Sequence, residues 1–101
     1  MNAKNLIKHL SGQRREALVH VHDKGVLVMF NASNETVHLT ESTREGLDVA
    51  GLIDALKSFV YIVGHDVKVY LSDNESVSFV YAEEDDCNDI VCIRSMQEAC
   101  L

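Results

Sequence analysis

The same order of hydrophobic patterns occurs twice along this 101-residue chain. An apolar helix face at Asn5–Leu10 precedes three short runs with the two-residue period of β-strands. A second helix, which contains Gly51–Leu56, again precedes three such runs. A helix followed by three strands, used twice, predicts one shared core, because each element must bury one face against the others. The few identities between the units leave both duplication and chance repetition open.

Two segments are predicted to be helical. Leu6, Ile7 and Leu10 form the apolar face of a short helix, which Ser11–Gly12 is expected to end, since glycine tolerates a positive φ. The longer helix, residues 49–63, should be the main core helix and end at Gly64. Its apolar residues recur at three- and four-residue steps: Val49, Leu52, Ile53, Leu56, Phe59, Val60 and Val63.

The start of the longer helix has two candidates. Ser42 with Glu45 fits a capping box, and Asp48 is a competing N-cap one turn later.

The first three strands are separated by turns at Asp23-Lys24-Gly25 and Asn31–Asn34. If both loops hold an even number of residues, alternation divides the side chains between two faces. The face predicted to be core holds Val19, Val21, Val28, Phe30, Val37 and Leu39. The opposite, mixed face holds His20, His22, Leu27, Met29, Thr36 and His38. The run Val26–Phe30 is apolar throughout, which predicts a strand covered on both faces.

In the second unit, residues 67–71 alternate, and a turn at Ser72–Glu75 leads to a strand with Val77, Phe79 and Tyr81 on one face. Ile90–Ile93 is the last predicted strand. The chain is therefore expected to be a single domain, residues 1–101, with an α+β fold. Two helices should pack on one side of a mostly antiparallel sheet of five or six strands, in the order α-β-β-β-α-β-β-β.

Charge and cysteine content restrict the environment and the partner. The net charge of −7 disfavours direct binding to nucleic acid, which needs Lys and Arg to displace counterions, and it favours a protein partner with a basic surface. The longest apolar run, Phe59–Val63, is far shorter than the roughly 20 residues of a membrane helix, and Lys8 interrupts the N-terminal apolar residues, so neither a membrane span nor a signal peptide is expected. Three cysteines, an odd number, predict reduced thiols and a cytoplasmic location; they are Cys87, Cys92 and Cys100.

The sharpest local feature is an acidic run near the C-terminus, made of Glu83, Glu84, Asp85, Asp86 and Asp89. Five carboxylates in seven residues could imitate a phosphate track or dock on a basic groove of a partner. A solvated hairpin loop that discourages strand pairing is the structural alternative. A metal loop is the least favoured interpretation, because the run lacks the spacing and the glycine of an EF-hand.

The mixed face carries a second candidate surface, formed by His20, His22, Met29 and His38. Imidazoles on one sheet face can hold zinc or copper, but no carboxylate or thiol completes a ligand set here. We therefore expect an interface, such as that of a homodimer, and neither a metal nor another cofactor. A pH-responsive contact is a further alternative.

No catalytic signature is recognisable in the sequence. It contains no Gly-rich phosphate loop, no G-x-S-x-G and no H-E-x-x-H, and no His lies beside a Cys. Cys92 is interpreted as a small buried apolar residue rather than a nucleophile. We assign no catalytic residue and expect a protein that is not an enzyme.

Three classes of function follow, in decreasing order of support. The first is a small acidic protein-binding module, an inhibitor or antagonist like those of phages and mobile elements, by analogy of size and charge. The second is a dimeric chaperone or adaptor, because the order helix, three strands, helix, strands resembles that of the small acidic chaperones of bacterial type III secretion. The chain lacks the substantial C-terminal helix of that group. The third is a metal-dependent or thiol enzyme.

Overall fold

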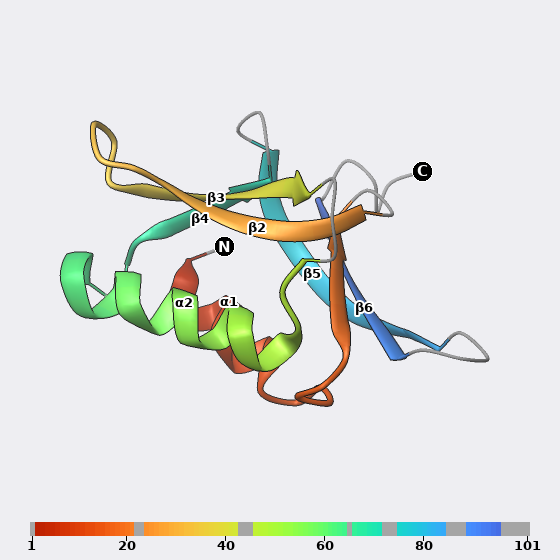
Figure 1. Ribbon diagram of the computed structural model, residues 1–101. Helices are drawn as coiled ribbons and strands as arrows, with labels where there is room; N and C mark the ends of the chain where they lie inside the picture. The colour runs from red at the N-terminus through yellow and green to blue at the C-terminus, as the bar shows by residue number, and fades with distance from the viewer. Residues whose placement is uncertain are drawn as a thin grey trace.

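The computed structural model describes residues 2–21, 24–42, 46–64, 66–71, 75–84 and 89–95, with the backbone alone for 75–84, 89, 94 and 95 (Figure 1). The elements, in chain order, are α1 (Ala3–Leu10), β1 (Leu18–Val21), β2 (Lys24–Asn31), β3 (Thr36–Ser42), α2 (Val49–Val63), β4 (Lys68–Leu71), β5 (Glu75–Glu84) and β6 (Asp89–Ser95). The fold is α+β, as the alternation of periods in the sequence predicts.

The six strands form a closed barrel in the order β1-β2-β3-β4-β5-β6. Neighbours joined by a hairpin are antiparallel, but β3 pairs with β4 in parallel, and so do β1 and β6. The sheet is therefore mixed, and the prediction of a mostly antiparallel sheet is wrong. The physical reason is the crossover: α2 carries the chain back along the barrel, so β4 starts at the same end as β3.

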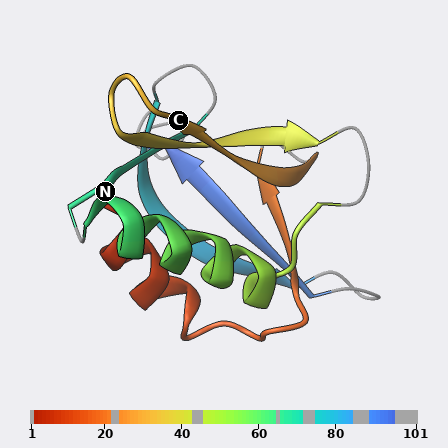
Figure 2. The same ribbon diagram turned by 60° about the vertical axis from the view of Figure 1, so that its left-hand side comes forward.

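The two helices lie side by side against the inner face of the strands (Figure 2). Both begin with a side-chain cap: Asn2 Oδ1 accepts a hydrogen bond from the Asn5 amide at 2.8 Å, and Asp48 Oδ1 accepts one from the Gly51 amide at 2.7 Å. Of the two N-cap candidates for α2, Asp48 is thus the residue that caps it.

The ends of the helices differ from one another. Gly64 ends α2 with a φ of 132°, as expected of glycine. The left-handed end expected at Ser11–Gly12 is wrong, because α1 ends at Ser11 in right-handed geometry, with its amide bonded to the carbonyl of Ile7 at 2.9 Å.

The two halves of the chain repeat the same contacts around an approximate twofold relation. At the start of α1, the Ala3 amide donates to the carbonyl of Val67, just before β4, at 2.8 Å. At the start of α2, the Val49 amide donates to the carbonyl of Ala17, just before β1, at 2.9 Å. Each helix start is therefore fixed to the first strand of the other half.

The parallel pairings obey the same relation. Val37 of β3 pairs with Val69 of β4, and Val91 of β6 pairs with Val19 of β1. The equivalence holds along both pairs, because Leu18 is opposite Ile90 just as Lys68 is opposite Thr36, one residue before the valine pairs. The repeated order in the sequence thus corresponds to a repeated arrangement in space.

Among the described side chains, buried residues from both helices and from β1, β2, β3, β4 and β6 form one core cluster. The face predicted to be core is confirmed: Val19, Val21, Val37 and Leu39 are fully buried, and Val28 and Phe30 pack against the cluster. On α2, Leu52 and Leu56 are fully buried, and the ring of Phe59 stacks on that of Phe30 with centroids 5.2 Å apart.

The prediction that β2 is covered on both faces is wrong. Leu27 is 46% exposed and Met29 is 60% exposed, because the helices cover only the inner face of the barrel. The outer side of β2 is thus an exposed apolar surface on the described part of the chain.

A β-bulge between Val77 and Phe79 interrupts the register of β5 with β6. Beyond it, Val80 pairs with Ile93 and Ala82 with Val91, and both β6 partners are buried. Val77, Phe79 and Tyr81 are described by their backbone alone, so the prediction that their side chains share one face stays a prediction.

Across the described ranges of the chain, no helix is both long enough and apolar enough to span a membrane.

Candidate functional site

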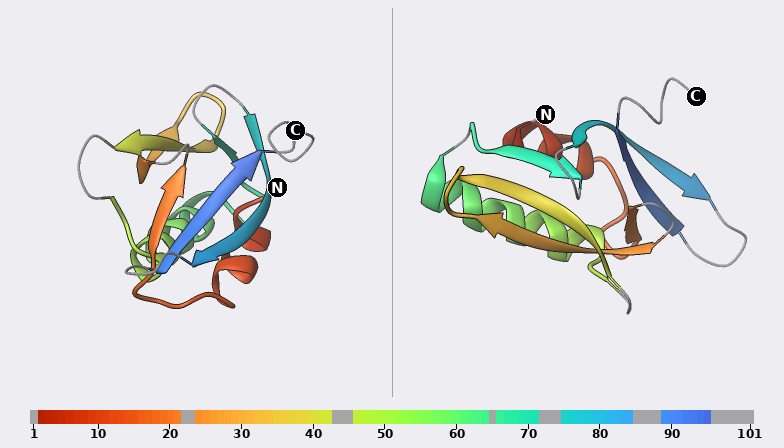
Figure 3. Two further views of the ribbon diagram at one scale, coloured as in Figure 1. Left: turned by 90° about the vertical axis from the view of Figure 1, so that its right-hand side faces the viewer. Right: turned by 90° about the horizontal axis from the view of Figure 1, so that it is seen from above.

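The acidic run lies where β5 ends and β6 begins. Glu83 and Glu84 are the last residues of β5, Asp89 is the first of β6, and Glu84 pairs with Asp89 in the antiparallel register. Asp85 and Asp86 lie outside the described residues. The two strands bring the two ends of the run together at one end of the molecule, away from the C-terminus of α2 (Figure 3).

The charge of the chain is strongly segregated. Residues 72–101 contain eight acidic residues and one Arg, which accounts for the whole net charge of −7. Residues 1–71 contain eight acidic and eight basic residues and are neutral overall. The net negative charge of the protein therefore lies in the segment that contains β5 and β6.

Two residues of the predicted histidine surface lie together on the outside of the barrel. Met29 and His38 are paired residues of β2 and β3, and the His38 ring stacks on Tyr70 of β4 with centroids 5.6 Å apart. His38 Nε2 also forms a hydrogen bond with the hydroxyl of Thr36 at 2.9 Å. The surface thus runs across three strands.

His20 lies elsewhere on the barrel. It pairs with Gly25 of β2 and with Cys92 of β6, and Met29 lies four positions beyond Gly25 on β2, about 13 Å along the strand. His22 lies outside the described residues. In the part of the chain that the structure describes, no three His, Cys, Asp or Glu residues form a group able to hold a metal ion.

Cys92 is a buried residue. It is 4% exposed and lies in the middle of β6. The predicted burial of Cys92 is confirmed, whereas its lack of a nucleophilic role stays a prediction. Cys87 and Cys100 lie outside the described residues.

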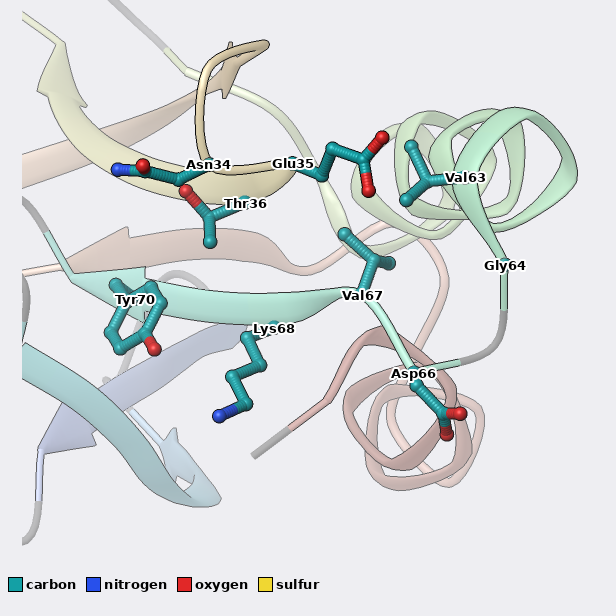
Figure 4. A pocket seen from close by; sticks show the side chains of 9 residues that line it. All are labelled: Asn34, Glu35, Thr36, Val63, Gly64, Asp66, Val67, Lys68 and Tyr70. Atoms are coloured by element: carbon teal, nitrogen blue, oxygen red, sulfur yellow. The ribbon is translucent and has the colours of Figure 1, made fainter.

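A pocket of about 490 Å³ lies at the opposite end of the molecule from the acidic run. Three parts of the chain form it: the β2–β3 turn, the end of α2, and the beginning of β4 with the residues before it (Figure 4). Its lining residues are Asn34, Glu35, Thr36, Val63, Gly64, Asp66, Val67, Lys68 and Tyr70.

Local backbone geometry presents the polar side chains of this pocket. Asn31 Oδ1 accepts from the amides of Ser33 and Asn34, at 3.0 and 3.4 Å, which closes the turn. Glu35 then has a φ of 53°, an uncommon left-handed conformation outside glycine, and its carboxylate extends toward Val63 (Figure 4). On the other side, Lys68 and Tyr70 extend from β4, where Lys68 is paired with Thr36 of β3.

The sequence gives little sign of this pocket. Its lining residues fall in two groups, 34–36 and 63–70, and only the parallel pairing of β3 with β4 brings the groups together. The one local signal is a Glu at the last position of a four-residue hairpin loop, where glycine or asparagine is usual.

Comparison with protein-family models, with curated proteins and with solved structures found no match to this chain. The fold of this chain is an α+β barrel with an approximate twofold relation. Because a fold alone does not imply a function, a function has to be inferred from the surfaces of the barrel.

Proposed function

We propose that this protein is a small acidic, non-enzymatic binding module that occupies a basic surface of another protein. The observation that supports the proposal is the charge segregation: residues 72–101 carry the entire net charge of −7, and the acidic run joins two paired strands within that segment. A dense group of like charges raises the rate of encounter with a surface of opposite charge, and the acidic run holds five carboxylates in seven residues.

The proposed mode of action is antagonism by mimicry. Closely spaced carboxylates resemble the repeated charges of a phosphate backbone, so a partner that normally binds nucleic acid through Lys and Arg would accept this end of the module. A reduced, cytoplasmic setting suits the odd number of cysteines in the chain. The partner's own ligand would then compete with the module for one basic groove.

Matched charge variants test the proposal. The protein is immobilised and exposed to a cell lysate at about 50 mM salt, and bound proteins are eluted at about 500 mM, where screening is strong. We compare wild type with Glu83→Gln/Glu84→Gln and with Glu16→Gln/Asp54→Asn. Both double variants remove two negative charges. The second variant changes exposed residues outside the acidic run. Capture of the salt-eluted partner should fall about threefold or more for the first variant only.

Two results would contradict the proposal. Equal capture by all three proteins would show that these carboxylates do not contribute to binding. A partner whose retention is the same at both salt concentrations would show that charge does not steer the association.

The dimeric adaptor remains the second candidate, because Leu27 and Met29 are exposed beside the His38–Tyr70 stack. A second copy that covered this surface would bury both side chains. Light scattering at micromolar concentration tests it: a mass near 23 kDa is expected for a dimer, twice the 11.3 kDa of the chain, and Met29→Glu should restore the monomer. A strict monomer rejects the adaptor.

A further inference from the structure

We infer that the pocket between α2, the β2–β3 turn and β4 binds a cationic group, an alkyl ammonium or guanidinium, by its charged head and its aliphatic stem. This inference does not depend on the proposed function, because the pocket and the acidic run lie at opposite ends of a molecule 41 Å long (Figures 1 and 4).

The charges around the pocket determine the sign of the charge that a ligand should carry. Glu35 lies on one wall and Asp66 at the rim, and among the described residues neither carboxylate has an ion-pair partner. The C-terminus of the 15-residue α2 also reaches the pocket at Val63 and Gly64. The last carbonyls of a helix carry a partial negative charge, which cations stabilise.

Among the described residues at the end of α2, no basic side chain offsets the partial negative charge of the helix C-terminus. The last turn of α2 contains no basic residue, whereas that of α1 contains Lys8 and His9. Within the described lining of the pocket, Lys68 is the one cation, and it projects from β4 below the strand rather than toward Glu35 (Figure 4). The Asp66 carboxylate points to the same side of the chain as Lys68, so these two opposite charges offset one another (Figure 4). Glu35 and the C-terminus of α2 are then the charges beside Val63, and both favour a positively charged ligand.

The remaining walls suit an aliphatic stem and a polar head. Val63 and Val67 line the pocket beside Glu35, so methylene groups of a bound chain would contact apolar carbon there (Figure 4). The Tyr70 ring and hydroxyl border the other side, and an aromatic face attracts cations. A volume of about 490 Å³ lies within the range of small-ligand sites and exceeds the size of an arginine side chain.

The probe that tests the sign is Nα-acetyl-L-arginine methyl ester, whose only charge is the guanidinium. Its matched control is Nα-acetyl-L-citrulline methyl ester, a neutral compound of nearly the same shape. Each is titrated into the ¹⁵N-labelled protein, and amide shifts are followed by NMR. We expect the arginine ester to shift the amides of Thr36, Gly64 and Lys68, and the citrulline ester to bind at least about fivefold more weakly.

Charge variants test which side chains of the pocket bind the cationic group. Glu35→Gln and Asp66→Asn should each weaken binding of the arginine ester about two- to fivefold, the range for partly exposed ion pairs, and Lys68→Gln should strengthen it by a similar factor. Glu16→Gln and Asp54→Asn remove the same charges from exposed positions outside the pocket and should leave the affinity unchanged.

A second arm separates the two sources of such a group. A Gly-Gly-Arg-Gly-Gly peptide that binds at least about tenfold more tightly than the ester would identify a protein side chain as the ligand, and equal affinity would identify a free small molecule. The inference is overturned if the citrulline ester binds as well as the arginine ester, if the shifts fall outside the pocket, or if neither arginine probe binds.

Discussion

Truncation of Leu56 to alanine is the perturbation that most directly tests the packing of the barrel. Leu56 is fully buried on the inner face of α2 and belongs to the core cluster. Leu56→Ala removes apolar atoms from this cluster and leaves a cavity that the surrounding residues can fill only in part. The expected loss in free energy of unfolding is about 2–5 kcal/mol.

This loss is large against the stability of a domain of this size, about 5–15 kcal/mol. The melting temperature should fall by roughly 8–40 °C, at about 4–8 °C for each kcal/mol. Urea denaturation followed by far-UV circular dichroism measures the change, with an unchanged slope as the sign that only the stability has altered.

The approximate twofold relation supplies an internal check. Leu10 is buried at the equivalent place on α1, so Leu10→Ala should cost about as much, within roughly 1 kcal/mol. Ile62 is 73% exposed on α2, and Ile62→Ala should change the stability by less than about 0.5 kcal/mol. A Leu56→Ala variant as stable as the Ile62→Ala control would refute the placement of α2 against the core.

Three further predictions concern a helix cap, a close approach of two backbone segments and a contact between two rings. Asp48→Ala should destabilise the protein by about 0.5–2 kcal/mol in urea denaturation, because it removes the bond to the Gly51 amide, whereas Asp48→Asn should retain most of it; equal losses would mean that the cap does not stabilise α2. Gly46→Ala should destabilise by more than about 2 kcal/mol, since a Cβ there would lie 2.6 Å from the carbonyl oxygen of Val26, and Gly12→Ala, with its nearest contact at 3.6 Å, is the tolerant control; similar melting curves would contradict the close approach at Gly46. A double-mutant cycle of Phe30→Leu and Phe59→Leu should give a coupling of about 0.5–1.5 kcal/mol from their stacked rings, and additive effects would argue against that contact.

Much of the fold could be predicted because hydrophobic periodicity indicates which face of a helix or strand is buried. The alternation from Val19 to Leu39 assigned the inner face of three strands correctly, since a shift of one residue would expose every one of those side chains. The three- and four-residue steps of α2 located its buried face for the same reason.

The outer face of β2 could not be predicted in this way. Leu27 and Met29 are apolar, so a pattern of hydrophobicity assigns them to a covered strand, yet nothing in the described part of the chain lies over them. Exposure of an apolar side chain depends on which elements reach it, and no local pattern encodes that. The acidic run, in contrast, was evident from composition alone, although its importance for binding stays a prediction.

The sequence by itself determined the kinds of element, their order, the inner faces of the first three strands, and the concentration of negative charge near the C-terminus. These follow from short-range properties: side-chain period, capping groups and charge. Tertiary structure alone decided the parallel pairing of β3 with β4 and of β1 with β6, the closure of the barrel, and the meeting of Glu35 with Val63 and Lys68 at one pocket. Those contacts join residues far apart in the chain, and which strand edges meet depends on how the two helices pack in the shared core.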